Sequence, residues 1–487
     1  MRTLLRRALP GVDVALLLLL CLCLAHTSSL WVQTNRTLAE EETRLGAWGP
    51  QDHVKGDLHG EDQKNFLPGG RPSGGREAGA TESSSETISS VTPEARAAAY
   101  QGKGGDDGSC VSAGPGHEEN QIAAVIVLCH DRPGYLSRSL ETLERRLRAR
   151  SISQRFPVYV SQDGEDKEVS AVVDRFSRSG LVRARWTHSP PAAFEEKLRA
   201  VVKPHMRSYH RIARHYKFAL STCFSCLGFP RAILVEDDLV VSADFFPYFA
   251  AAAPLLDRDP TLYAASAWND NAVAGLPRGD PAALQRTDFF PGLGWMVTRR
   301  LWREVEVGWP EAFWDEYMRS PHVRLGRQVV QPEVSRTVNI GERGASSGED
   351  YHGGAARVRG AEIYVNFVER DLSLLADQAA YRNEVKSRVA RAEVEILDAF
   401  LEERTKIADG GKRVLRDAKV EYASEEEHER ALGLFGLPYP PRGSFEGVTT
   451  IMDPREGRLG RVHIAPVGYG LSGDSAVVLD GRSSRTV

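Results

Sequence analysis

The sequence has little cysteine and no strong excess of either charge. Six cysteines are scattered over 487 residues, which excludes a small disulfide-stapled scaffold. The 62 basic and 66 acidic side chains give a net charge of −4, so nucleic acid is not expected as the main partner. No internal repeat is found. With 41% hydrophobic residues, the chain can bury at least one sizeable core.

A single C-x-x-C pair, Cys223 and Cys226, falls on a predicted apolar helix. The sequence has no second pair of this spacing, and one pair alone is a weak zinc signal. We therefore predict that both cysteines pack in a hydrophobic core.

The N-terminus combines basic residues with an apolar run. As a helix, Val14–Ala25 covers roughly 18 Å, short of the ~30 Å hydrocarbon thickness, so a cleaved signal peptide is one interpretation. Extending the segment to residues 9–32 reaches spanning length, and Arg2, Arg6 and Arg7 precede it. We favour a signal anchor at 9–32 with a cytoplasmic tail at 1–8. Under either interpretation, we expect the rest of the chain to be exported into the secretory lumen.

The next segment, residues 33–118, is rich in Gly, Ser, Glu and Arg and lacks apolar periodicity. This composition predicts a disordered stalk. Asn35 begins an Asn-Arg-Thr stretch that matches the glycosylation acceptor pattern. Residues 468–487 are predicted to be a second disordered segment, a C-terminal tail.

Strand and helix patterns alternate from about residue 119. The apolar run Ile122–Cys129 predicts a strand, and leucines follow it at helical spacing. Strands are also predicted at 156–164 and 182–188, and a helix at 215–229 leads into another strand. This order predicts an α/β fold with a doubly wound, mostly parallel sheet, in which ligands bind beyond the carboxyl ends of the strands.

Three strand-like stretches lie near the C-terminus, at residues 418–424, 445–453 and 460–467. They predict a compact antiparallel unit, which would form the sheet of a smaller C-terminal α+β domain.

The stretch AILVEDDLVV, residues 232–241, carries Glu236, Asp237 and Asp238 at the end of a predicted buried strand. Carboxylates there are unfavourable unless a partner cancels their charge. A hard cation such as Mn²⁺ or Mg²⁺ prefers oxygen ligands and often takes one or two carboxylates when substrate phosphates complete its shell. A solvated acidic loop paired with an arginine is the alternative, and the strand context alone leaves both open.

Five stretches in matching order carry a resemblance to a known family. They are VEDDLVVSADFFPYF (235–249), SAWNDN (266–271), RTDFFPGLGWMV (286–297), WPEAFWDEYMR (309–319) and PEVSRT (332–337). Together they resemble the N-acetylglucosaminyltransferase I family, Golgi enzymes that add β1,2-linked GlcNAc to the α1,3-mannose arm of an N-glycan core. The similarity covers about residues 120–467. Related transferases that extend O-linked mannose share several of these motifs.

The resemblance implies a GT-A nucleotide-sugar-binding fold in residues 119–345, and a lid loop with an acceptor-side domain in residues 346–467. It also implies UDP-GlcNAc as donor, Mn²⁺ as cofactor, a high-mannose N-glycan on glycoproteins as acceptor, and direct displacement with inversion. The implied location is the Golgi membrane, with a single-pass type II topology and the catalytic domain in the lumen.

The same resemblance assigns roles to single residues. Asp238 would be the metal ligand, and Asp237 a contact to the nucleotide ribose or sugar. The other donor contacts would be Arg132 and Asp163 at the uridine part, His215, and Ser346 at the phosphates from a mobile loop within 339–354. Asp315 would be the general base.

The chemistry of the assigned base agrees with its surroundings in the sequence. An acceptor hydroxyl needs one correctly placed carboxylate, which need not bind the metal. Phe313 and Trp314 precede Asp315, and their rings could exclude water and form a sugar platform. Glu316 is the rival, because composition cannot separate adjacent carboxylates.

The sequence departs from the family at its cysteines and in the loop. Animal members carry two disulfides. Here Gly164 stands where the partner of Cys129 is expected, and Ala264 and Val329 occupy the second pair. We therefore expect Cys129 to be an unpaired thiol packed on a strand. Residues 347–354 also differ from the family pattern, which affects the expected lid contacts.

Two rival functions stay open at the level of sequence. One is a β1,2-GlcNAc transferase that acts on O-linked mannose. The other is a non-catalytic sugar-binding protein of the same fold, which the presence of both Asp238 and Asp315 disfavours. A glycoside hydrolase is weaker still, because it needs no nucleotide site.

Overall fold

The computed structural model describes residues 116–342, 358–395, 417–454 and 460–470. All of them belong to one unit, Ser89–Val487. The predicted signal anchor and cytoplasmic tail lie outside these ranges, as do the stalk before residue 116 and the tail after residue 470. No helix within the described ranges is both long enough and apolar enough to cross a membrane.

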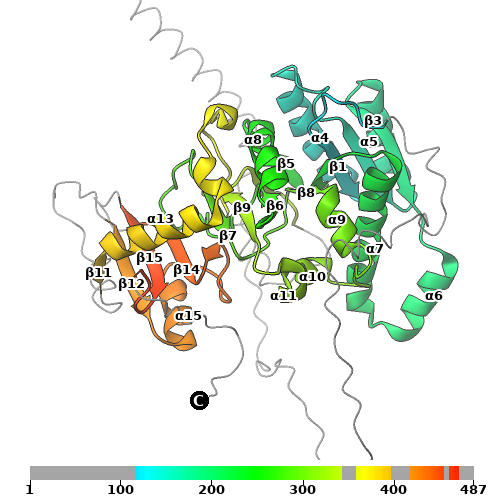
Figure 1. Cartoon of the computed structure of the whole chain (residues 1–487). Coiled ribbons are helices and arrows are strands. Elements are labelled where there is room, and N and C mark those ends of the chain that lie inside the picture. Colours follow the sequence, from blue (N-terminus) through cyan, green and yellow to red (C-terminus); the bar gives the residue numbers. More distant parts are fainter. Residues whose placement is uncertain (1–115, 343–357, 396–416, 455–459, 471–487) are drawn as a thin grey trace, which may run out of the picture. The chain divides into compact units, whose positions relative to one another are not determined.

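An eight-stranded sheet with the order β3-β2-β1-β4-β8-β6-β9-β7 forms the centre of the fold (Figure 1). Its strands are β1 (Ala124–Cys129), β2 (Val158–Asp163), β3 (Val182–His188), β4 (Arg231–Glu236), β6 (Leu262–Ser266), β7 (Leu284–Thr287), β8 (Trp295–Thr298) and β9 (Gln328–Pro332). Strands β3, β2, β1 and β4 are parallel, and β6 and β9 run in the same direction, whereas β8 and β7 run against it. The predicted mostly parallel sheet is confirmed, with β8 as an antiparallel strand between β4 and β6.

Helices cover both faces of this sheet. One face packs against α4 (Pro133–Arg148), α5 (Lys167–Arg178) and α8 (Phe245–Arg258), and the other packs against α7 (Arg207–Ser221), α9 (Arg299–Val305) and α10 (Trp314–Arg319). Successive side chains of a strand point to opposite faces, so Val125 joins the first cluster and Ile126 the second. The doubly wound arrangement follows from strands that are apolar on both sides.

Two sequence predictions of helices can be compared with this arrangement. The leucines after β1 lie in α4 and are buried, which confirms their helical spacing. The helix predicted at 215–229 begins earlier, at Arg207, and its last turn is a π-helix, η3 (Thr222–Cys226). Shorter segments include α6 (Ala192–Val201), η2 (Pro204–Met206), α11 (Pro321–Arg324), η5 (Phe367–Glu369) and η6 (Ser373–Ala376).

A five-stranded sheet forms the C-terminal part of the fold, in the order β11-β12-β15-β14-β13. Its elements are β11 (Glu393–Glu395), β12 (Ala418–Tyr422), β13 (Ser444–Phe445), β14 (Val448–Met452) and β15 (Arg461–Pro466), with α13 (Gln378–Arg391) and α15 (Glu425–Leu434). Figure 1 shows α13 running across this sheet, where Val389 packs against Val448 and Ala465. The predicted all-antiparallel pairing is wrong, because β12 and β15 pair in parallel through register-matched residues such as Val420 and Ile464.

The two sheets are joined by backbone contacts. The amide of Asp288, just after β7, donates to the carbonyl of Ser444 on β13 at 2.8 Å, and Thr287 donates its hydroxyl to the same carbonyl at 3.1 Å. The C-terminal sheet therefore attaches at the edge strand of the central sheet, away from the parallel strands.

The cysteines divide into two kinds. Cys129 on β1 and Cys223 on η3 are free and buried, as predicted, and burial raises the pKa of both thiols. Cys226 is partly buried and packs against the core, as predicted, and it is disulfide-bonded. Ala264 and Val329, at the positions of the absent second disulfide, are direct neighbours on β6 and β9.

Candidate active site

The parallel strands bring three polar residues together at their carboxyl ends. Asp163, His188 and Glu236 are the last residues of β2, β3 and β4. Arg132 follows β1 at the start of α4, and Asp237 and Asp238 form the turn between β4 and a short strand, β5 (Leu239–Val241). Four of the seven site residues assigned in the sequence, Arg132, Asp163, Asp237 and Asp238, thus lie at the strand ends where ligands of such sheets bind.

Register places Arg132 against the acidic turn. Glu236 pairs with Leu128 on β1, and the amide of Asp237 donates to the carbonyl of Leu128 at 3.0 Å. The Arg132 guanidinium donates to both carboxylate oxygens of Asp237 and contacts Oδ2 of Asp238 at 2.8 Å. The aspartates are almost fully buried, with exposed fractions of 2% and 7%. One guanidinium therefore faces three closely spaced carboxylates.

The negative charge that Arg132 does not neutralise raises the pKa values of the neighbouring carboxyl groups. Burial raises the pKa of Asp237 to about 7, and the Asp238 charge adds to this rise although Arg132 opposes it. Burial and the Asp238 charge likewise raise the pKa of Glu236 to about 7. Without a further positive charge, this cluster is electrostatically unfavourable near neutral pH.

The geometry around Asp238 fits a cation that needs only one protein ligand. Its Oδ1 is buried and has no hydrogen-bond partner among the described residues. A buried carboxylate oxygen without a donor is a costly arrangement unless another group binds it. No three acidic, histidine or cysteine side chains converge on a metal position within the described ranges, so phosphates and water would have to complete the shell.

The loop after β10 (Thr337–Asn339) begins directly over this carboxylate. β10 pairs with β5, and the amide of Ile340 donates to the carbonyl of Asp238 at 2.8 Å. A Cβ atom at Gly341 would lie 2.5 Å from Asp238 Oδ2, so only glycine permits this close approach. Ser346, the predicted phosphate contact further along the loop, lies outside the described residues.

Histidines surround the end of β2. His188 donates from Nδ1 to Oδ1 of Asp163 at 2.6 Å, and its ring stacks on His215 with centroids 5.5 Å apart. His215 hydrogen-bonds the Ser161 hydroxyl at 2.8 Å, and burial lowers the pKa of His215 to about 4, which keeps the imidazole neutral. Burial favours protonated Asp163, but the His188 hydrogen bond and the nearby histidines outweigh it and lower the pKa of Asp163.

Asp315 lies in the first turn of α10, next to an aromatic cluster. Trp314 stacks on Tyr216 with ring centroids 4.0 Å apart, and the Tyr216 hydroxyl donates to Glu236 at 2.7 Å. This chain of contacts joins the α10 motif to the acidic strand end. The ring of Phe313, 37% exposed, stacks on Tyr209 and borders the same region, which fits a sugar platform.

The two adjacent carboxylates of α10 differ in their surroundings. Both accept from Nη1 of Arg319, Asp315 at 2.8 Å and Glu316 at 2.6 Å. The Asp315 side chain is 39% exposed and Glu316 is 67% exposed. After burial and Glu236, the Asp315 charge also raises the pKa of Tyr216. Asp315 is therefore the carboxylate on the side of the acidic cluster.

Sequence reasoning missed three residues of this site. His188 holds Asp163, Tyr216 bridges Trp314 and Glu236, and Arg319 binds Asp315. His188 had a usable signal, because it ends a predicted strand next to the one that ends in Asp163. Tyr216 directly follows His215, but its contacts depend on how α7 packs against α10, which the sequence does not reveal.

Comparisons with known proteins agree with these observations. A model of the GNT-I family matches residues 108–468. The alpha-1,3-mannosyl-glycoprotein 2-beta-N-acetylglucosaminyltransferase of Arabidopsis thaliana is 34% identical over 333 residues, which cover 67% of this chain and 70% of that protein.

Solved structures are similar only at a low level. The mannosyltransferase PcManGT of Pyrobaculum calidifontis, in complex with GDP-Man and Mn²⁺, is 14% identical with a TM-score of 0.30, over 45% of this chain and 56% of that one. GalNAc-T7 with UDP, GalNAc and Mn²⁺ is 12% identical with a TM-score of 0.32, over 56% of this chain and 52% of that one. The chain spans about half of each of these proteins.

Proposed function

This chain belongs to the GNT-I family and is a glycosyltransferase, and we propose that it moves GlcNAc from UDP-GlcNAc, in β1,2 linkage, to the α1,3-linked mannose of an N-glycan core. The observation that carries this proposal is the buried acidic turn after β4, which Arg132 alone does not neutralise. A bound cation and a diphosphate would complete its charge balance.

The donor would lie across the strand ends. Asp163, held by His188, is an acceptor suited to the imide N–H of a uracil ring, and neutral His215 lies beside it. Asp237 would contact the ribose or the sugar, and Arg132, which binds Asp237 and Asp238 in the free protein, would contact the uridine part. Ser346 stays a proposed phosphate contact.

Asp238 is the residue that would hold the cation, for which we propose Mn²⁺. The ion would act as a Lewis acid for the leaving diphosphate. Gly341 leaves room for the Asp238 carboxylate, and the buried position of Asp238 excludes bulk water.

Asp315 would remove the proton from the acceptor hydroxyl as that oxygen attacks the anomeric carbon from the face opposite the diphosphate. Attack from that face inverts the configuration, so an α-linked donor gives a β product. Arg319 orients the Asp315 carboxylate in the free enzyme, and Phe313 would pack against the sugars. Trp314, expected from the sequence to share this role, is buried and stacks on Tyr216 instead. For the N-terminus we propose a signal anchor at residues 9–32, with the catalytic part in the Golgi lumen.

A transfer assay tests the proposal. Full-length protein is incubated with UDP-GlcNAc, Mn²⁺ and a five-mannose N-glycan, beside a parallel reaction with an O-mannosylated peptide. We expect transfer to the N-glycan and a β1,2 linkage in the product. Transfer to the peptide alone would favour the O-mannose alternative. Binding of UDP without any transfer would favour the non-catalytic alternative.

His188 gives a prediction specific to this chain. Replacing it with Phe retains the ring that stacks on His215 but removes the donor to Asp163. A lost hydrogen bond to a charged group costs about 1.5 kcal/mol or more, so we expect the KM for UDP-GlcNAc to rise roughly tenfold with little change in kcat. Steady-state kinetics with varied donor measures both.

The conservative variant His188→Asn serves as the control. An Asn side chain places an N–H close to the position of the His Nδ1, so it should recover most of the donor KM. If both variants raise the KM equally, loss of packing is the cause and the positioning role of His188 is wrong.

A further inference from the structure

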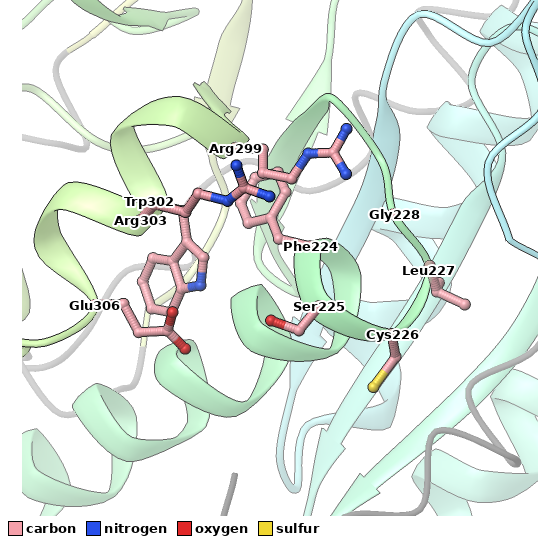
Figure 2. A pocket seen from close by; sticks show the side chains of 9 residues that line it. All are labelled: Phe224, Ser225, Cys226, Leu227, Gly228, Arg299, Trp302, Arg303 and Glu306. Carbon is pink, nitrogen blue, oxygen red and sulfur yellow. The ribbon is translucent and has the colours of Figure 1, made fainter. Parts of the chain in front are cut away.

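A cavity of about 350 Å³ lies between η3 and α9 (Figure 2). The chain leaves η3 through Gly228 and enters β4 at Arg231, which pairs with Thr298 immediately before α9. The acidic cluster follows Glu236 at the other end of β4. Six strand residues span about 17–20 Å, so this cavity is separate from the proposed catalytic site.

Two arginines of α9 line the cavity. Arg299 and Arg303 are four residues apart, so their side chains lie on one face of the helix. Neither guanidinium is in an ion pair with a carboxylate of the described residues. Glu306 is the acid in the cavity wall, and the Ser221 hydroxyl donates to it at 3.0 Å. The lining therefore carries two positive charges and one negative charge.

A buried donor points to a ligand independently of charge. Trp302 lies between the two arginines in the sequence and is 1% exposed, yet its Nε1 has no hydrogen-bond partner among the described residues. In Figure 2 the indole nitrogen is on the ring edge that faces Ser225. By contrast, the neighbouring Trp309 donates its Nε1 to the carbonyl of Ala213 at 2.8 Å. An indole N–H can only donate, so an acceptor is missing at Trp302.

Gly228 lines the opposite wall of the cavity and has no side chain to fill it. Its φ of +69° favours glycine, and a Cβ atom there would lie 3.9 Å from Nη1 of Arg299. Arg299 thus extends over the backbone at Gly228, and the Ser225 hydroxyl is exposed next to it. The charged groups around this space, apart from Glu306, are the guanidinium donors of Arg299 and Arg303.

We propose that this cavity binds a small free anion through a phosphate or carboxylate group, held by Arg299 and Arg303 and by the N–H of Trp302. Guanidinium groups match the paired oxygens of either group, and the indole N–H would supply a further donor. The Phe224 ring gives the site an apolar side. This site is independent of UDP-GlcNAc transfer, because none of its residues lies at the carboxyl ends of the parallel strands; Arg299 follows β8, which runs in the opposite direction.

The indole signal of Trp302 tests the proposal. Full-length protein labelled with ¹⁵N-tryptophan is titrated with inorganic phosphate, and the Trp302 signal is identified by its loss in Trp302→Phe. We expect this signal to move in a saturable way, and the double variant Arg299→Gln/Arg303→Gln to weaken the apparent affinity roughly tenfold or more. Transfer activity in the double variant should be unchanged, which shows that it still folds.

Arg300→Gln is the matched control, because Arg300 lies on the same helix but donates to the carbonyl of Leu256 at 3.1 Å. It should titrate like the wild type. No movement of the Trp302 signal, or equal movement in the double variant, would overturn the proposal.

Discussion

Replacing Asp315 with Asn is expected to lower the rate of GlcNAc transfer by about 10³-fold, because the acceptor hydroxyl loses its proton acceptor. Asn is nearly the same size and can still accept from Arg319, so the helix α10 should remain in place. Donor binding should be unchanged, since Asp315 is separated from the acidic turn by Trp314 and Tyr216. Single-turnover transfer to a five-mannose glycan measures the rate, and calorimetry with UDP measures donor binding.

The matched control is Glu316→Gln in the next position. Glu316 shares Arg319 with Asp315, but its side chain is 67% exposed. We therefore expect a change of no more than about threefold, the effect of a solvent-exposed ion pair. If Glu316→Gln loses the activity and Asp315→Asn retains it, the assignment of the base is reversed.

Much of the sheet could be predicted from the sequence because local patterns decide it. The apolar run predicts β1, and the leucine spacing predicts α4 as the next element, with an apolar face that packs on the strand. The first strand–helix unit can therefore be predicted from local patterns alone. Parallel order then places Asp163 and the acidic turn at one edge without further information. The clustering of Arg132, Asp163 and the two aspartates was predictable for that reason.

The antiparallel insertion of β8 could not be predicted from local patterns. Its four residues, Trp295–Thr298, are buried on both faces and look like any short core strand. Its direction follows from where the chain enters after the PGLG turn, whose glycines Gly292 and Gly294 adopt positive φ values. The same limit applies to β12 and β15, where the intervening chain length decides between parallel and antiparallel pairing.

Contacts between side chains of different helices and strands also could not be predicted from the sequence. Each of the two ion pairs of Arg132 involves residues more than 100 positions away, and the bridge from Tyr216 to Glu236 depends on the packing of α7. Family resemblance named Arg132 as a uridine contact, but not its contacts to Asp237 and Asp238. The electrostatics of the site therefore required the structure.

Replacing Asp238 with Asn is expected to remove the manganese-promoted part of UDP-GlcNAc binding, a loss of about a hundredfold or more in donor affinity with Mn²⁺ present. Asp238 has a buried carboxylate oxygen without a partner among the described residues, so the loss of its charge would leave the cation without its protein ligand. Calorimetric titration of the donor, with and without Mn²⁺, measures the effect. Asp131→Asn is the control, because the Asp131 side chain is 63% exposed. This variant should bind the donor with the same affinity as the wild type.

The metal-free stability of the same variant separates a cation site from a structural ion pair. Removing the Asp238 charge relieves the repulsion that raises the pKa values of Asp237 and Glu236, while Arg132 keeps its contacts to Asp237. The folded-state pKa values of these two groups should move back toward their usual range, so ionisation of their carboxyls would oppose folding less at neutral pH. We therefore expect the Tm without metal to be unchanged or higher, in contrast to the loss of donor binding. A large drop in the metal-free Tm would show instead that Asp238 serves the fold through Arg132, and the proposed cation site would be wrong.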